Sequence, residues 1–223
     1  MLSKRGMKLG SYDTAANEWT LAAWKLGDAP QKTNLVEKPG GDGSWDLSTA
    51  LTDGVLRYGD RQLSATFECS EGDRLYRENK IRQMVNQLDG MVVHIELPDD
   101  SDRYLVGRLK VVKEYNDLAH GSVSVSATCE PWKYNKTETK VSLTAATTEK
   151  TANLVNNGRR VVVPVLTVTG SGASVRMAYG SSSLTMAAGT AQWPDLILTP
   201  GTHALKYSGT GSLVITYREA MLE

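Results

Sequence analysis

The sequence is poor in the residues that usually carry chemistry. It has two cysteines, three histidines and one phenylalanine, and neither charge is in excess. Cys69 and Cys129 are too few for a disulfide framework and lack the spacing of a metal site. With 25 basic and 25 acidic residues, the chain also lacks the positive excess of a duplex-binding protein. Disulfide-stapled, zinc-binding and DNA-binding classes are therefore disfavoured.

Long apolar runs are missing as well. No stretch is long enough to cross a bilayer, and residues 1–6 are not followed by the apolar core of a secretory signal. Cys69 and Cys129 each end the apolar face of an expected strand, which predicts buried thiols. We expect no membrane insertion and synthesis in a reducing cytoplasm.

Catalytic patterns are absent too. His94, His120 and His203 stand apart from any nucleophile or metal motif. The carboxylates of Asp99–Asp102 lack the spacing and distal glutamate of an EF-hand, so a solvated hairpin tip is the expected structure. The sequence predicts no enzyme activity, no metal site and no cofactor.

What the chain does contain is a series of β patterns. Apolar and polar residues alternate strictly over 62–70 and again over 122–129, which predicts strands with one face on a core and the other left polar. Residues 91–97 and 104–115 are two further expected strands, and the second is long enough to extend beyond the body of its sheet. A hairpin of that length needs support from a partner.

One helix is expected after the first of these strands. Ser70 is the predicted N-cap, with Asp73 reaching back as a weak capping box. Four apolar residues then fall on one helical stripe, namely Ile81, Met84, Val85 and Leu88. Asp89-Gly90 supplies the stop signal.

The sequence pattern changes after Trp132 to short β runs separated by small residues, which predicts two domains, residues 1–134 and 135–223. The second block has short β runs, in which Pro164 restricts the run 161–169 to an edge or a bulge. Its expected turns are 170–172, 180–183, 199–202 and 208–211. The fold class predicted is mainly β: an N-terminal β-sandwich with one helix and a long hairpin, then a smaller antiparallel β-sandwich.

A glycine-rich loop is the most distinctive local feature. Gly40, Gly41 and Gly43 allow the backbone to double back, and no helix follows that would make a phosphate site. We expect Trp45 and Leu47 to anchor the loop in the core, so that Trp45→Ala costs a few kcal/mol. Arg61 is expected to pair with Asp46 or Asp60.

The order of these features resembles the distal tail protein (Dit) of long-tailed, non-contractile phages and their prophages. The family loop reads Pro-Gly-x-Asp-Gly-x-x-Asp-Leu-Thr, and Pro39-Gly40-Gly41-Asp42-Gly43-Ser44-Trp45-Asp46-Leu47-Ser48 matches it with Ser48 in place of Thr. Tyr58-Gly59-Asp60-Arg61, the capped helix and Cys129-Glu130-Pro131-Trp132 follow in the family order. The resemblance covers roughly residues 6–134.

The resemblance implies a structural role at the tip of a virion tail. It implies a hexameric ring that joins the tail tube to the tail-tip proteins and leaves a channel through which DNA passes without specific binding. It also implies a C-terminal galectin-like or carbohydrate-module-like sandwich. Within this hypothesis, the hairpin over 91–115 supplies a ring contact, with Asp99, Asp100, Asp102 and Tyr104 near its turn.

A second hypothesis is a non-catalytic carbohydrate-binding protein that recognises a cell-surface glycan. Its candidate stacking residues are Trp193, Tyr179 and Tyr207. Core packing is the favoured interpretation of all three, although Trp193-Pro194-Asp195 sits at a turn.

Overall fold

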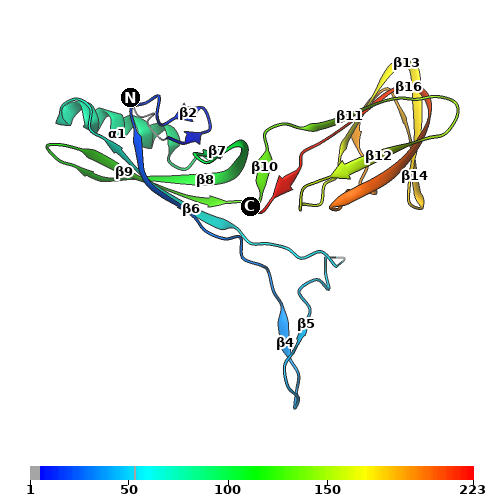
Figure 1. Cartoon of the computed structure of the whole chain (residues 1–223), viewed down its shortest axis with the longest axis horizontal. Coiled ribbons are helices and arrows are strands. Elements are labelled where there is room, and N and C mark those ends of the chain that lie inside the picture. Colours follow the sequence, from blue (N-terminus) through cyan, green and yellow to red (C-terminus); the bar gives the residue numbers. More distant parts are fainter. Residues whose placement is uncertain (1–5, 53) are drawn as a thin grey trace. The chain divides into compact units, whose positions relative to one another are not determined.

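The chain folds into two compact β units. The computed structural model describes residues 6–52 and 54–223, and the division between the units falls between Trp132 and Lys133, close to the boundary expected after Tyr134. One helix lies within these described ranges, and every strand ladder inside either unit is antiparallel (Figure 1). The predicted mainly β class is confirmed. No helix in this part of the chain is long and apolar enough to span a bilayer. The signal-peptide expectation concerns residues 1–6, of which 1–5 lie outside the described residues.

The N-terminal unit is built on a sheet whose strands run in the order β2-β1-β7-β8-β9-β6-β3. In chain order these strands are β1 (Lys8–Leu9), β2 (Tyr12–Asp13), β3 (Thr20–Leu26), β6 (Arg61–Cys69), β7 (Val92–Leu97), β8 (Asp100–Asn116) and β9 (Gly121–Cys129). Side chains alternate between the two faces as the sequence predicts: Leu63 and Phe67 on β6 are buried, while Gln62 and Ser64 are exposed. Both cysteines lie in the core.

The helix α1 (Arg74–Leu88) covers the buried face of this sheet. Ile81, Met84 and Leu88 are buried, as the apolar stripe predicts. The helix begins one turn later than expected, because Asp73 is the N-cap and its carboxylate accepts the backbone N–H of Tyr76. Ser70 is therefore not the cap. The chain leaves the helix through Gly90, whose φ of +76° is the left-handed conformation that glycine adopts at low cost.

The C-terminal unit is a sandwich built on two long bent strands. Its strands are β10 (Lys133–Asn135), β11 (Thr139–Thr144), β12 (Lys150–Asn156), β13 (Val165–Tyr179), β14 (Ser182–Ala187), β15 (Gly189–Gln192), β16 (Gly201–Tyr217) and β17 (Ala220–Met221). The first part of β13 pairs with β15 and with the end of β16, which also carries β11. The second part of β13 pairs with β14 and with the beginning of β16, which also carries β12. Each long strand thus belongs to both layers.

The glycines in these strands mark bends and not turns. The sequence predicts turns at 170–172 and 208–211, but β13 and β16 run continuously through both segments, and their register shifts between Thr169 and Ser174. Gly209 and Gly211 lie opposite that shift with φ of +131° and +101°. A turn does lie near the expected position 180–183, because β13 ends at Tyr179 and β14 begins at Ser182.

Pro164 also differs from the expectation. The sequence places it inside a strand that it would restrict to an edge, but β13 begins one residue later and is a central strand with partners on both sides. Pro164 precedes the strand and removes no ladder hydrogen bond. The shared core of the two layers contains fully buried residues from both, including Leu166, Ile215, Val175, Met177 and Leu205.

The bend requires a glycine at position 209, and this requirement can be tested. A Cβ at this position would fall against the carbonyl oxygen of Ser174, a backbone atom that cannot move without disturbing the ladder. We expect Gly209→Ala to lower the free energy of unfolding of the C-terminal unit by about 3 kcal/mol or more. Chemical denaturation followed by circular dichroism measures the loss.

Gly180→Ala is the matched control, because Gly180 also has a positive φ (+57°) but has open space around the added Cβ. It should cost only about 1–2 kcal/mol. Equal losses in the two variants would contradict the steric role of Gly209.

Candidate functional site

The motif residues of the glycine-rich region lie on a hairpin inserted between β3 and β6. Because β3 and β6 are antiparallel neighbours, residues 27–60 form one enlarged connection between them, which we call the arm. Backbone hydrogen bonds close its base: Gly59 N–H donates to the Pro30 carbonyl at 2.7 Å, and Gln31 and Tyr58 form a bridge. The ring of Tyr58 packs edge-on against Trp132, with 5.5 Å between centroids. The Tyr58-Gly59 part of the family motif therefore fixes the base of the arm.

The distal part of the arm is a two-stranded ribbon, β4 (Leu35–Glu37) and β5 (Ser44–Asp46). The loop between them turns at Gly40 and Gly43, whose φ values of +69° and +76° favour glycine. Gly41 N–H donates to the Lys38 carbonyl and closes the turn. As expected, the glycines shape a reversal of the chain, but the reversal lies at the exposed end of the arm.

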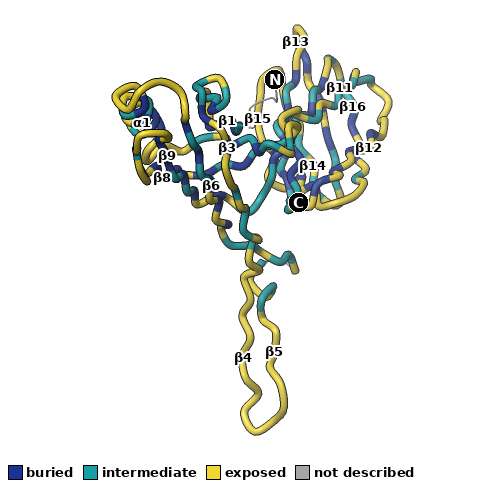
Figure 2. The backbone as a smooth tube through the Cα atoms, turned by 60° about the vertical axis from the view of Figure 1, so that its left-hand side comes forward, coloured by how far each residue is buried: buried dark blue, intermediate teal, exposed yellow. Residues whose placement is uncertain are grey.

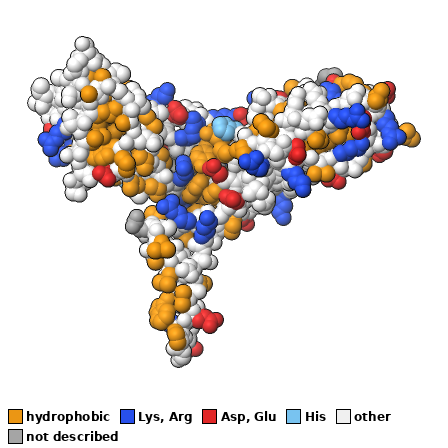
Figure 3. Space-filling model, turned by 180° about the vertical axis from the view of Figure 1, so that it is seen from behind, with side chains coloured by type: hydrophobic (Ala, Val, Ile, Leu, Met, Phe, Trp, Pro, Cys, Tyr) orange, Lys and Arg blue, Asp and Glu red, His pale blue; other side chains and the backbone are white. Residues whose placement is uncertain are grey.

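An apolar face runs along this ribbon without a core beneath it. Val36 stands directly opposite Trp45, and Leu47 follows on the same side. Their exposed fractions are 40%, 52% and 43%. Figure 2 shows the ribbon exposed along both strands, and Figure 3 shows hydrophobic side chains gathered along it. The expectation that Trp45 and Leu47 anchor the loop in the core is wrong, because the alternation that places them on one face does not say whether that face is covered.

Acidic groups flank the apolar face. Glu37, Asp42 and Asp46 are exposed, and Lys38 is the one base between Leu35 and Asp46. Hydrogen bonds from the side chain and the backbone of Ser48 lower the pKa of Asp46 from its usual value. Asp46 makes no ion pair with Arg61 within the described residues, so that predicted pair is wrong.

Arg61 instead serves the base of the arm. Its side chain is buried, and its Nε donates to the carbonyl of Gly27 at 2.8 Å, where the arm leaves β3. The alternative pairing of Arg61 with Asp60 stays a prediction.

The expected ring-contact hairpin has stabilising contacts within its own two strands. The turn between β7 and β8 lies at Pro98-Asp99, and the carboxylate of Asp100 is 3.6 Å from the guanidinium of Arg103. Tyr104 stacks on His94, with 4.2 Å between ring centroids and 22° between planes. A role of Asp99, Asp100, Asp102 and Tyr104 in a ring stays a prediction.

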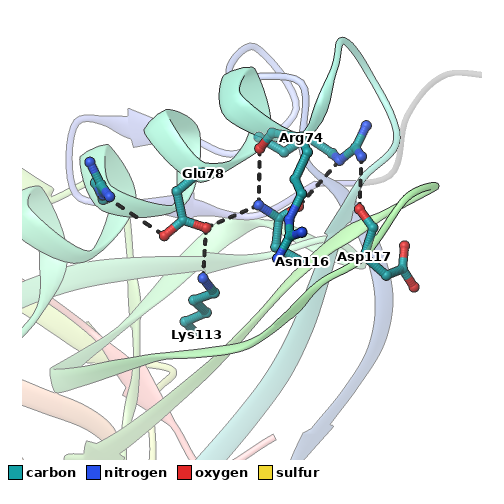
Figure 4. A network of polar contacts seen from close by, with 7 residues as sticks. Arg74, Glu78, Lys113, Asn116 and Asp117 are labelled. Carbon is teal, nitrogen blue, oxygen red and sulfur yellow. Dashed lines mark hydrogen bonds and ion pairs between the residues drawn. The ribbon is translucent and has the colours of Figure 1, made fainter.

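The sequence predicts that β8 extends beyond the body of its sheet. In the structure, side chains of α1 bond to this end of the strand (Figure 4). Glu78 on the helix accepts from Lys113 at 2.6 Å and from the amide of Asn116 at 3.0 Å. These two partners, in that order, lower the pKa of Glu78. The buried guanidinium of Arg77 donates to the carbonyls of Gly72, Asp117 and Leu118. The partner that supports this hairpin is thus the helix of the same chain.

The outward face of the N-terminal sheet carries a second surface that sequence analysis missed. Lys25, Ser64, Ser126 and Lys110 form one register row across β3, β6, β9 and β8. Arg108 lies in the adjoining row beside Thr128. We call this surface the basic face. Period-two alternation places each of these residues on a polar face, but only the register brings them together.

Two of the three aromatic candidates for glycan stacking are buried. Trp193 and Tyr207 belong to the core of the C-terminal sandwich and are buried, so their proposed stacking role is wrong. The hydroxyl of Tyr179 donates to the Ile197 carbonyl and lies 2.7 Å from Nδ1 of His203. Core packing, the favoured interpretation, is confirmed for Trp193 and Tyr207, and a stacking role of Tyr179 stays a prediction.

The thiol of Cys129 is not set up for nucleophilic attack. Burial raises the pKa of the Cys129 thiol to about 11, so that it is protonated at neutral pH and a poor nucleophile. Across the described ranges, no three residues among histidine, cysteine, aspartate and glutamate lie together as a metal site requires.

Comparison with solved structures finds a match over the whole chain. It is similar to the structure described as "Crystal Structure of SPP1 Dit (gp 19.1) Protein, a Paradigm of Hub Adsorption Apparatus in Gram-positive Infecting Phages". The TM-score is 0.68 at 16% identity, and the match covers 96% of this chain and 98% of the other. The chain has a Dit-like fold. The similarity includes both units in the same order, beyond the region that carries the sequence resemblance. No family model and no curated protein matches the sequence.

The exposure of Trp45 reverses the expected result of replacing it. Trp45→Ala should shift the melting temperature by less than about 2 °C, because a substitution at an exposed site changes stability by about 0.5 kcal/mol or less. Thermal unfolding of the purified chain at low concentration measures it.

Trp19→Ala is the matched control. Trp19 is fully buried and its Nε1–H donates to the Tyr12 hydroxyl, so its loss should cost about 3–5 kcal/mol. A comparable loss in the two variants would mean that Trp45 packs into a core.

Proposed function

We propose that this chain is a structural component of a phage tail tip, where it forms a ring between the tail tube and the distal tail-tip proteins. The ring is a homo-hexamer with a central channel through which DNA passes without specific binding. The protein is made in the cytoplasm of the bacterial host and ends in the virion tail. It carries out no catalysis.

The observation that carries this proposal is the full-length fold similarity to a Dit protein. Similarity limited to one β unit would mean little, because small β-sandwiches serve many functions. Here one match spans both units and 98% of the other chain.

Charge and surface chemistry agree with this role. The formal net charge is zero, so the chain as a whole does not attract a polyanion that must slide past it. The arm leaves an apolar ribbon uncovered, and monomeric proteins rarely keep such surface in water. A subunit whose neighbours cover that surface accounts for it.

The proposal predicts the mass of the assembled protein. Light scattering of the purified chain should give about six times the 24.3 kDa of one subunit at high concentration. Negative-stain images should show rings with an open centre. A mass that stays at one subunit up to millimolar concentration, with no ring in the images, would contradict the proposal.

A further inference from the structure

A cleft lies between α1 and the segment 10–18, which contains β2 (Figure 1). Its volume is about 470 Å³, within the roughly 300–1,000 Å³ of ligand sites in proteins. The residues that line it are uncharged and mostly polar, namely Ser11, Tyr12, Asn17, Gln83, Gln87 and Leu88. We call it the polar cleft. It belongs wholly to the N-terminal unit.

The helix supplies one wall of the polar cleft. Gln83 and Gln87 are four residues apart in α1, so their side chains lie on the same side of the helix. Both are exposed, and neither side chain has a hydrogen-bond partner within the described residues. Leu88 next to them is buried in the core. This wall therefore offers two amides for hydrogen bonding beside a small apolar surface.

The opposite wall is held in place by its own hydrogen bonds. Thr14 Oγ1 accepts from the Met7 N–H at 2.8 Å and donates to the Met7 carbonyl at 3.0 Å. Nδ2 of Asn17 donates to the Asp13 carbonyl at 2.8 Å, and Oδ1 of Asn17 has no partner in the part of the chain that the structure describes. A wall that is already ordered lowers the entropic cost of binding a ligand.

Glu18 joins the two walls. Its carboxylate accepts from the Tyr76 hydroxyl and lies 3.2 Å from Nζ of Lys80, and both partners are on α1. Among the described residues other than glycine, Glu18 alone has a positive φ, +67°. Side chains disfavour this conformation, and residues held in it cluster at ligand sites and switch regions. The unusual backbone thus occurs where the hairpin segment is tied to the helix beside the polar cleft.

The chemistry of the walls narrows the ligand. Because no lining residue is charged, an ionic ligand finds no opposite charge there. Amides and hydroxyls both donate and accept hydrogen bonds, as the hydroxyls of a sugar do. The C–H face of a sugar ring matches the apolar surface of Tyr12 and Leu88. An apolar peptide side chain would instead favour a mainly apolar pocket.

We propose that the polar cleft binds a neutral saccharide, with the amides of Gln83 and Gln87 and Oδ1 of Asn17 as its hydrogen-bonding groups. The site is separate from the aromatic residues of the C-terminal unit. It lies within one subunit, so the inference goes beyond the proposed function and does not rest on it. Repeated around the proposed ring, such a site would bind a polysaccharide with higher avidity than a single copy does.

Saturation-transfer NMR of the full chain with neutral disaccharides tests the site. Lactose, maltose, cellobiose and N,N′-diacetylchitobiose are the probes. At least one should bind with a Kd of about 1–10 mM. Gln83→Ala combined with Gln87→Ala should weaken that binding at least about tenfold, because two hydrogen bonds to the sugar are lost. Both positions are exposed and alanine favours a helix, so the variant should remain folded.

Asn86→Ala is the matched control, because Asn86 is an exposed amide on α1 that does not line the polar cleft. It should bind the sugar like the wild type. No transfer to any of the four probes, or equal binding by the double glutamine variant, would overturn the inference. Glycerol phosphate bound as tightly as the best disaccharide would contradict a neutral ligand.

The measurement observes the sugar, so it applies to single subunits and to assembled protein alike. Binding that vanishes on assembly would mean that a neighbouring copy occupies the polar cleft, and would contradict the inference. Sugar binding by a chain that never forms rings would support the saccharide site while the proposed ring fails. Rings without sugar binding would give the opposite result.

Discussion

The pairing of β3 with β6 is the constraint on which the N-terminal unit depends. It fixes β6 against the core, through Leu63 and Phe67, and it brings the two ends of the arm to neighbouring strands. Gly27 N–H donates to the Gln62 carbonyl, and Arg61 returns a bond to the carbonyl of Gly27. The same ladder aligns Lys25 with Ser64 and so continues the basic face onto the edge strand. One antiparallel pair thus positions both the arm and part of the basic face.

The two sides of this sheet have different partners. The buried side is covered by α1, which also secures the end of the β8–β9 hairpin through Arg77 and Glu78. The outward side is left with small hydroxyl side chains and a few cations. Exposed apolar side chains on such a face would promote aggregation, whereas small polar side chains stay hydrated. The face can therefore take part in a reversible protein contact without causing aggregation. The zero net charge of the chain hides a separation of charge between the acidic arm and the basic face.

Much of the fold can be predicted from the sequence where a local period decides it. Alternation along 62–69 and the apolar stripe of Ile81, Met84 and Leu88 identify a strand and a helix, because each pattern has one compact solution. The glycines of 170–172 and 208–211 mislead, since glycine allows a bulge within a strand as readily as a turn. Only the pairing of β13 with β16 distinguishes the two.

The candidate site is harder to predict for a related reason. The motif around Trp45 indicates a family, but burial depends on what lies opposite, and about half of Trp45 is left exposed. The same limit concealed the basic face, whose lysines come from β3 and β8 and meet only through β6 and β9. Conversely, Trp193 at a turn resembles a ligand platform but is part of a core.

The most direct measurement is photo-cross-linking from the arm within the assembled protein. A benzophenone amino acid in place of Trp45 keeps an aromatic side chain there and reacts with whatever covers it. Assembly from a mixture of isotopically light and heavy subunits lets mass spectrometry separate links within a chain from links between chains. The account predicts links from position 45 to peptides of another subunit. Links confined to the same chain would contradict it.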